Sequence, residues 1–179
     1  MNKAPSYSTA AFSVRENDMG RLVIPVVFVL DDIRSMANVG SIFRTADSLG
    51  ITRLVLCGIT GRPPHREINK TALGATDSVE WEYIASAVDA IGELKNQGYD
   101  VWALEQGEGS VLLSDAFADQ DQPLAIVLGN EVKGVSAEVL ERVDRTVEIP
   151  QMGIKHSLNV AVAAGIAAWE CLRAAKERD

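Results

Sequence analysis

Residues 147–159 form the stretch of the sequence with the clearest capacity to hold a ligand. They read Val-Glu-Ile-Pro-Gln-Met-Gly-Ile-Lys-His-Ser-Leu-Asn and continue into an Ala- and Val-rich run that ends at Trp169. The pattern predicts a short apolar strand stopped by Pro150, a polar turn with free backbone amides, and a buried helix that starts at Ser157. Because backbone N–H groups at turns and helix starts bind polar groups, we expect a concave site for a small polar ligand here.

A second segment, Gly129-Asn-Glu-Val-Lys-Gly-Val-Ser136, has two glycines in the spacing of a phosphate-binding loop. The lysine that must follow the second glycine of such a loop is replaced by Val135, so no side chain would reach the terminal phosphates of a nucleotide. A nucleotide-binding regulator is therefore disfavoured. The sequence also lacks a GxGxxG after its first expected strand and the GxSxG of a hydrolase, which disfavours a dinucleotide cofactor and a nucleophilic serine.

Side chains that bind soft metals are few and scattered. Cys57 and Cys171 form no CxxC pair, and only His65 and His156 could join them as ligands. We interpret the two thiols as small buried residues and expect no metal.

The charge of the chain is acidic overall and basic in one region. A formal charge of −8 argues against a protein that coats nucleic acid non-specifically, because phosphate binding draws on clustered lysines and arginines. One such cluster precedes the acidic second half of the chain, and it consists of Arg34, Arg44, Arg53, Arg62, His65, Arg66 and Lys70. Composition alone leaves two interpretations open, a basic patch that contacts nucleic acid and a solvated charged loop.

Alternating apolar runs predict the elements that position these side chains. Strands are expected at residues 22–30, 53–57, 79–83, 101–104, 124–128 and 146–149, with Pro25 near the start of its strand or on an edge. Helices are expected between them, at residues 39–49 before Gly50, at 68–74, from Ser86 to Gly98, after Ser136, and at the C-terminal run. The alternation predicts an α/β fold with a mainly parallel sheet flanked by helices. Ligands bind at the carboxyl ends of such strands, which places residues 104–107, 129–134 and 149–157 around one crevice.

The 179 residues, 47% of them apolar, are expected to form a single domain at residues 21–179 after an aperiodic arm at residues 1–20. The longest apolar run is too short to span a bilayer, and the N-terminus lacks the apolar core of a signal peptide. We therefore expect a cytoplasmic protein without membrane contact.

Arg44 stands out on the helix expected at residues 39–49. At about 100° per residue it projects nearly opposite the apolar stripe, so it cannot be a core residue. By position alone it is an ordinary solvated arginine.

Three separated segments together resemble the three motifs of SpoU (TrmH-type) RNA 2′-O-ribose methyltransferases, within the SPOUT superfamily. The first is Asn-Val-Gly-Ser-Ile-Phe-Arg-Thr-Ala-Asp-Ser-Leu-Gly at residues 38–50. The second is Ile-Val-Leu-Gly-Asn-Glu-Val-Lys-Gly-Val-Ser at residues 126–136, and the third is Ile-Pro-Gln-Met-Gly at 149–153 with Ser-Leu-Asn-Val-Ala-Val-Ala at 157–163. Their order and wide separation make chance agreement very improbable.

The resemblance implies a parallel-sheet domain with a C-terminal trefoil knot, a homodimer, and S-adenosylmethionine as cofactor. The implied reaction is methylation of a ribose 2′-hydroxyl, with tRNA the favoured substrate and rRNA the second. The alternative is a non-catalytic RNA-binding protein that keeps the fold. The presence of all five motif side chains, Asn38, Arg44, Glu131, Ser157 and Asn159, argues against that alternative.

The same resemblance implies roles for individual residues. Arg44 would be the leading catalytic residue, supported by Asn38, Glu131, Ser157 and Asn159, in the site of its own subunit or of the partner. Because a guanidinium stays protonated at neutral pH, we expect Arg44 to bind an RNA phosphate and so activate the hydroxyl, with direct base catalysis as the alternative.

The resemblance also implies binding residues. The cofactor would contact Leu104, Gly107, Leu128, Gly129, Asn130, Ile149, Pro150, Gln151, Ser157 and Leu158. RNA would contact Arg34, Arg62, His65, Arg66, Lys70 and Lys155. Gln151 departs from the family pattern, which usually has Met after the Ile-Pro pair, and Lys155-His156 adds positive charge to a variable interval.

Overall fold

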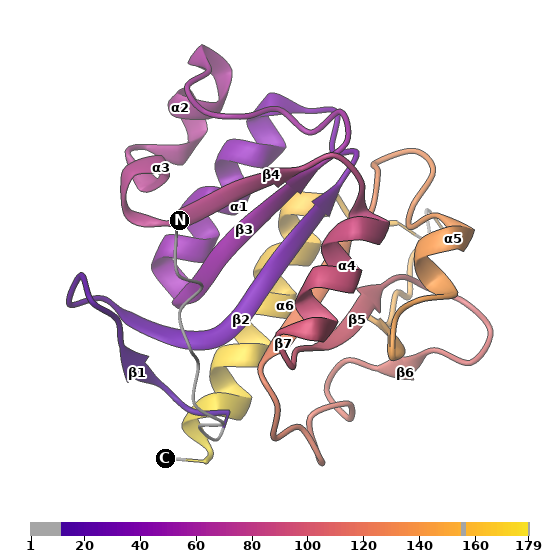
Figure 1. Cartoon of the computed structure of the whole chain (residues 1–179). Coiled ribbons are helices and arrows are strands. Elements are labelled where there is room, and N and C mark those ends of the chain that lie inside the picture. The colour runs from indigo at the N-terminus through magenta and orange to yellow at the C-terminus, as the bar shows by residue number, and fades with distance from the viewer. Residues whose placement is uncertain (1–11, 155–156, 179) are drawn as a thin grey trace.

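The computed structural model describes residues 12–154 and 157–178 as one twisted sheet with helices on both faces (Figure 1). The strand order is β4-β3-β2-β7-β5-β8-β6, and every neighbouring pair along this path is parallel. The strands are β2 (Leu22–Asp31), β3 (Ile51–Cys57), β4 (Glu80–Ile84), β5 (Asp100–Leu104), β6 (Val111–Leu112), β7 (Leu124–Leu128) and β8 (Arg145–Glu148). The predicted α/β fold with a mainly parallel sheet is confirmed.

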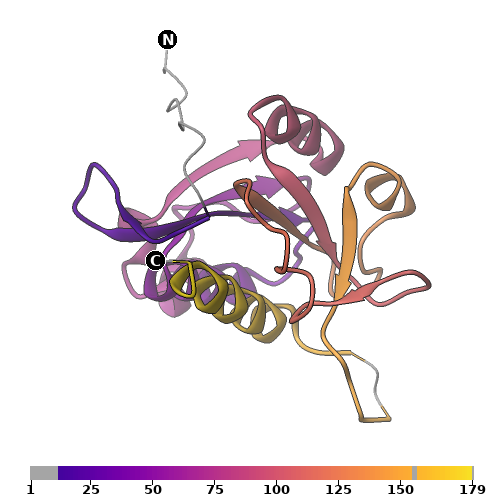
Figure 2. The same cartoon turned by 90° about the horizontal axis from the view of Figure 1, so that it is seen from below.

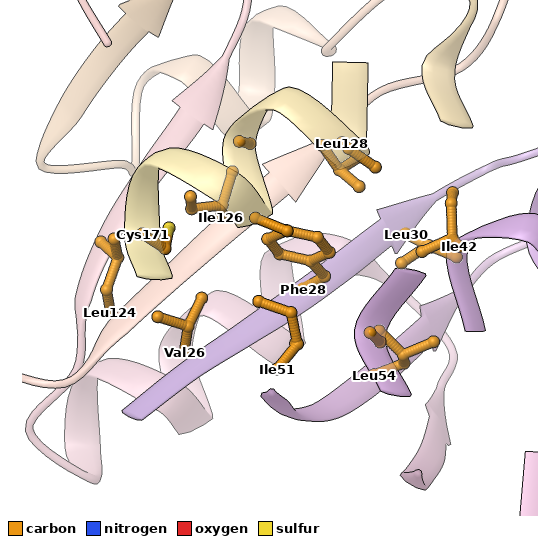
Figure 3. Close-up of a cluster of buried hydrophobic side chains, with 14 of the residues drawn as sticks. Val26, Phe28, Leu30, Ile42, Ile51, Leu54, Leu124, Ile126, Leu128 and Cys171 are labelled. Carbon is orange, nitrogen blue, oxygen red and sulfur yellow. The ribbon is translucent and has the colours of Figure 1, made fainter. Parts of the chain in front are cut away.

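Two layers of helices cover this sheet, with α4 and α6 on opposite faces (Figure 2). The helices are α1 (Met36–Leu49), α2 (Arg66–Ala72), α3 (Ala75–Ser78), α4 (Ala87–Asn96), α5 (Ala137–Leu140) and α6 (Val160–Lys176). Side chains alternate along a strand, so Phe28 of β2 packs into the layer of α1 and α6 while Val29 packs into the layer of α4. Figure 3 shows Phe28 between Ile126 of β7 and Ile51 of β3.

Pro25 lies inside the first half of β2, which is an interior strand. The register between β2 and β3 shifts between Ile24 and Val27, and pairing with β7 begins at Val26. Because proline has no N–H to donate to a ladder, an irregularity of this kind accommodates it within the sheet.

The first helix of the fold ends as the sequence predicts. Ser35 caps α1 by accepting a 3.2 Å hydrogen bond from the backbone N–H of Asn38. At the other end Gly50 adopts φ 75° and donates its N–H to Ala46, which is the left-handed cap that glycine favours. These two caps hold Asn38 in the first turn, at the carboxyl edge of the sheet.

Two expectations at the chain ends were wrong. Of the arm expected at residues 1–20, residues 1–11 lie outside the described part of the chain. Residues 12–20 are not a loose arm, because Phe12 is fully buried, with its ring 5.9 Å from that of Phe117, and β1 (Arg15–Glu16) pairs antiparallel with β2. The last helix starts at Val160 rather than at Ser157, because the side chain of Asn159 accepts from two backbone N–H groups and caps it. The expectation that this helix is buried holds for one face only, because Val162 and Trp169 on its other face are exposed. Among the described residues, no helix is long and apolar enough to cross a membrane.

Candidate functional site

A cavity of about 650 Å³ opens at the carboxyl ends of β5, β7 and β8. Parallel strands end at one edge of the sheet, so the loops after them converge there. The lining comes from three stretches that are far apart in sequence: residues 104–106, residues 128–135, and a third that contributes residues 148, 149, 151, 157–160 and 163. Apolar walls are provided by Leu104, Leu128, Ile149 and Leu158, and polar groups by Asn130, Gln151, Ser157 and Asn159.

The loop after β7 closes on itself at the floor of this cavity. Asn130 donates its backbone N–H to Gly134 at 3.1 Å, and Gly134 returns its N–H to Asn130 at 2.9 Å. Gly129 must be glycine here, since an added Cβ would lie 2.4 Å from the carbonyl carbon of Gly134. The close backbone approach therefore gives the cavity its shape.

The side chain of Asn130 connects this loop to the first strand. Its Oδ1 accepts from the N–H groups of Val132 at 2.9 Å and Lys133 at 3.0 Å. Its Nδ2 donates to the carbonyl of Asp32 at 2.7 Å, just beyond the end of β2. The Asn130 side chain thus holds the backbone with its oxygen and with one of its two N–H groups.

Glu131 joins the same loop to the start of α1. Its carboxylate accepts from the backbone N–H of Arg34 at 2.9 Å, from that of Ser35 at 3.0 Å, and from Nδ2 of Asn38 at 3.0 Å. Desolvation alone would raise the pKa of Glu131, but these hydrogen bonds together outweigh it and hold the pKa below its ordinary value. Glu131 is therefore an ionised structural acceptor at neutral pH.

Asn159 adds the third segment to this network. Its Nδ2 donates to Oδ1 of Asn38 at 3.2 Å, while its Oδ1 accepts from the N–H of Ala161 at 2.9 Å. One continuous chain of hydrogen bonds thus runs from Glu131 through Asn38 to Asn159. Asn38 itself does not line the cavity, but both of its partners do.

Two lining carboxylates were not named as site residues from the sequence, although Glu105 lies in the segment 104–107 that was expected at the crevice. Glu105 follows β5 and accepts the backbone N–H of Val135 at 2.9 Å, and Glu148 accepts from the hydroxyl of Ser110 at 2.5 Å. With Glu131 they give the cavity three carboxylates against one lysine, Lys133. The sequence feature that could have identified them is an acidic residue at the end of an expected strand. The balance of charge suits a ligand that carries a positive charge.

Arg44 lies outside the cavity of its own chain. It is exposed on α1, six residues after Asn38, which places it about 9 Å further along the axis and rotated by about 120°. Gly107 and Pro150 also lie outside the lining. The geometry therefore brings Asn38, Glu131 and Asn159 together and leaves Arg44 apart.

Most of the predicted RNA-contact residues lie on a different part of the surface, whereas Arg34 adjoins the cavity through its hydrogen bond to Glu131. Arg34, Arg62, His65, Arg66 and Lys70 are all exposed, and the last four belong to α2 or to the loop before it. The Arg62 guanidinium lies 4.3 Å from the centre of the Tyr83 ring. Lys155 is outside the described residues.

Acid and thiol groups at the end of β2 and β3 offer no nucleophile. Burial, and secondarily the charge of Asp32, raises the pKa of Asp31 to about 6. Burial, followed by the charge of Asp31, raises the pKa of the Cys57 thiol to about 12, which keeps it protonated and unreactive. Within residues 12–154 and 157–178, no group of three or more His, Cys, Asp or Glu side chains could hold a metal ion.

Comparisons with known proteins identify a family. The model of the SpoU rRNA Methylase family matches residues 25–169. The tRNA (guanosine(18)-2′-O)-methyltransferase of Aquifex aeolicus is 32% identical over 154 residues, which are 86% of this chain and 71% of that protein. The 23S rRNA (guanosine-2′-O-)-methyltransferase RlmB of Vibrio parahaemolyticus is 30% identical over 168 residues, 91% of this chain and 66% of that protein.

A similar solved structure is the AdoMet-bound rRNA methyltransferase of Sinorhizobium meliloti. It matches with a TM-score of 0.77 and 31% identity, over 83% of this chain and 56% of that chain. The present chain therefore spans little more than half the length of that protein.

Proposed function

Because this chain belongs to the SpoU rRNA Methylase family, we propose that it transfers a methyl group from S-adenosylmethionine to a ribose 2′-hydroxyl of RNA. The observation that carries the proposal is the hydrogen-bonded chain Glu131–Asn38–Asn159 at the rim of the 650 Å³ cavity. It joins one residue from each of the three motifs, although these motifs are far apart in the sequence.

The cavity fits the proposed cofactor chemically. A flat, largely apolar adenine suits walls made of leucine and isoleucine, and the sulfonium and ammonium charges suit a cavity with an excess of carboxylates. Leu104, Leu128, Ile149 and Leu158 would hold the adenosine part, and Gln151 and Ser157 would contact polar groups. When bound, S-adenosylmethionine supplies the electrophilic methyl group.

The residues of this chain would position the nucleophile. A ribose hydroxyl must be aligned with the methyl group, and its proton must be lost as the new bond forms. Glu131 is committed to two backbone N–H groups and to Asn38, so it would fix the loop and the Asn38 amide rather than take a proton. Ser157 and Asn159, at the exposed mouth of the cavity, are the side chains placed to contact the ribose.

We further propose that the protein acts as a homodimer and that Arg44 serves the cavity of the partner copy. Two features support this assignment. Arg44 lies outside its own cavity, and large apolar side chains beside the cavity and along α6 are open to solvent: Met152 is 100% exposed, Ile154 93%, Val162 52% and Trp169 57%. Val162 and Trp169 are two turns apart on one helical face, which a second copy would cover. Arg44 would then bind an RNA phosphate beside the reacting ribose.

The relatives act on both tRNA and rRNA, and we favour tRNA for this chain, with rRNA second. We also propose that the protein acts in the cytoplasm, where both classes of RNA occur. The trefoil knot and the organisation as a single domain stay predictions of the same proposal, with the start of that domain moved ahead of residue 21 because Phe12 and β1 pack with it.

Labelled S-adenosylmethionine incubated with the protein and undermodified RNA tests the reaction. We expect label in a ribose that nuclease mapping locates, and no label in RNA whose target 2′-hydroxyl is replaced by hydrogen. Transfer that survives this replacement would contradict the reaction class. Absence of cofactor binding at millimolar concentration in calorimetry would favour the non-catalytic RNA-binding protein instead.

A further inference from the structure

A second cavity, of about 410 Å³, lies at the opposite edge of the sheet from β8 and β6. It is formed by the loop after β3, by α2 and α3, and by the edge strand β4, which stand together in Figure 1. Its volume falls in the ~300–1,000 Å³ range of small-ligand pockets. The lining includes Pro63, Pro64, Asn69, Thr76, Asp77 and Trp81, and none of these residues belongs to the first cavity.

Four lining side chains carry unused hydrogen-bonding groups. Within the part of the chain that the structure describes, the polar side-chain atoms of Asn69, Thr76, Asp77 and Trp81 form no hydrogen bond or ion pair. Neighbouring polar residues differ, since Ser78 donates to Asp47 at 2.6 Å and Thr71 donates to Ala37 at 3.0 Å. The cavity therefore presents four side chains whose polar groups are available to a ligand.

This combination matches the chemistry of a nucleobase. Trp81 offers an indole ring for stacking, and two proline rings supply a further apolar wall. The Asp77 carboxylate accepts hydrogen bonds from ring N–H or amino groups, while the Asn69 amide and the Thr76 hydroxyl both donate and accept. The carboxylate disfavours an anion in the cavity, and a single carboxylate is a poor site for a divalent cation.

Positive charge borders the cavity on the α2 side. Arg66 and Asn69 are three residues apart on α2 and therefore share a face, and Lys70 follows directly. Among the described residues Arg66 and Lys70 form no ion pair, so both are free for phosphate groups. Two nearby acids are already neutralised, because Asp47 pairs with Arg21 and Glu82 with Arg53.

The cavity is rigidly connected to the helix that carries Asn38 and Arg44. Gly40 of α1 lies against α2 so closely that an added Cβ would be 2.3 Å from the carbonyl oxygen of Ile68. The hydrogen bond from Thr71 to Ala37 joins the same two helices. A base in the second cavity would therefore be held at a fixed distance from the methylation site.

We propose that the second cavity binds one unstacked nucleobase of the RNA substrate, with the phosphates beside it held by Arg66 and Lys70. The inference rests on the proposed function, because it assigns a recognition site for the same substrate. Sequence-specific recognition of RNA uses bases that are splayed out and stacked on aromatic side chains, so the substrate would present a loop or bulge here.

Dissociation constants for undermodified tRNA, measured by fluorescence anisotropy without cofactor, test the proposal independently of methyl transfer. Trp81→Leu removes the stacking ring and should weaken binding about 5- to 100-fold. Asp77→Asn keeps the shape of the side chain but removes its charge and one acceptor, and should weaken binding about tenfold. Arg66→Ala should weaken binding and reduce the slope of log K against log salt by about one.

Glu67→Gln is the matched control, since this exposed acid lies on α2 outside the cavity, and its removal should leave binding equal or tighter. Affinity for S-adenosylmethionine should be unchanged in all variants. Trp81 also packs against the core, so Asp77→Asn decides the outcome if Trp81→Leu does not fold. Unchanged tRNA affinity in Asp77→Asn would overturn the proposal.

A photoreactive oligoribonucleotide carrying 4-thiouridine in its loop provides a direct readout. Mass spectrometry should locate the crosslink in the peptides that contain Pro63, Pro64 or Trp81. Crosslinks confined to the first cavity would overturn the second site while leaving the methyltransferase proposal intact.

Discussion

Glu131→Gln tests whether the hydrogen-bonded junction between the three motifs organises the site. The carboxylate accepts three hydrogen bonds, one through Oε2 from Arg34 and two through Oε1 from Ser35 and Asn38. Glutamine keeps one acceptor oxygen and turns an amino group toward the third donor. Hydrogen bonds to charged groups contribute about 1.5–3 kcal/mol each, but the side chain is exposed and water can replace the lost partner. We therefore expect a loss of about 1–2 kcal/mol in the free energy of unfolding.

A thermal melt and a methyl-transfer assay measure the two consequences. The midpoint should fall by about 2–8 °C for a chain of this size. Turnover should fall by about 10- to 100-fold, because the Asn38 amide loses its fixed position. Glu141→Gln is the control, since its exposed carboxylate accepts no hydrogen bond from the described residues, and it should change neither value. A Glu131→Gln protein with the stability and turnover of the parent would refute the assigned role.

A double-mutant cycle that combines Glu131→Gln with Asn38→Ala measures the coupling free energy between these two side chains. Because Asn38 Nδ2 bonds directly to the carboxylate at 3.0 Å, the two substitutions should be coupled by at least about 0.5 kcal/mol.

The folded-state pKa of Glu131 is lowered, so the stabilising effect of its carboxylate is present above the unfolded pKa and is lost as pH falls through the folded pKa. The stability difference between parent and Glu131→Gln should shrink accordingly in acid.

Four further outcomes are expected. Arg44→Ala should abolish methyl transfer while calorimetric binding of S-adenosylmethionine persists, and full turnover on the true RNA would remove Arg44 from the mechanism. Gly129→Ala should impair cofactor binding first, because its Cβ would lie 2.4 Å from backbone of the same loop. Gly92→Ala is its control and should bind the cofactor normally, because beyond its own helix backbone and its chain neighbours no atom of the described residues lies within 4 Å of the added Cβ. Asp31→Asn should gain stability relative to the parent as pH rises from about 4 to 6 in urea titrations, because burial raises the folded pKa of Asp31 to about 6 and ionisation then costs stability; a difference independent of pH would contradict this. Trp169→Glu should convert the proposed dimer to a monomer in analytical ultracentrifugation, and an unchanged sedimentation coefficient would place the interface elsewhere.

Local patterns in the sequence predicted most of the elements because their causes are local. The strand predicted at residues 124–128 is observed as Leu124–Leu128, since five consecutive apolar residues suit a strand buried on both faces. Gly50 ends α1 because glycine adopts the left-handed conformation of the cap, and Ser136 begins α5 because its side chain accepts a hydrogen bond from the first turn. The start of α6 was predicted too early, because both Ser157 and Asn159 are residues that favour a helix N-cap. Only Asn159 caps the helix in the structure.

The N-terminal segment shows where local patterns fail. Residues 12–20 have no periodicity, yet Phe12 is fully buried, because its burial depends on Phe117, more than 100 residues later. The two-residue strands β1 and β6 are likewise too short to leave a pattern. Their pairing is decided by the strands beside them.

By itself, the sequence determined the fold class, the family, and the chemical groups present at the strand ends, because residue type and spacing along the chain carry that information. The tertiary structure decided which of these groups meet. It joins Glu131 to Asn38 across 93 residues and Asn38 to Asn159 across 121, because β2 and β7 are neighbours in the sheet and α1 packs on α6. It also separates Arg44 from its own cavity and gathers Asn69, Asp77 and Trp81 around a second one. These distances follow from strand order and helix packing, which no local pattern encodes.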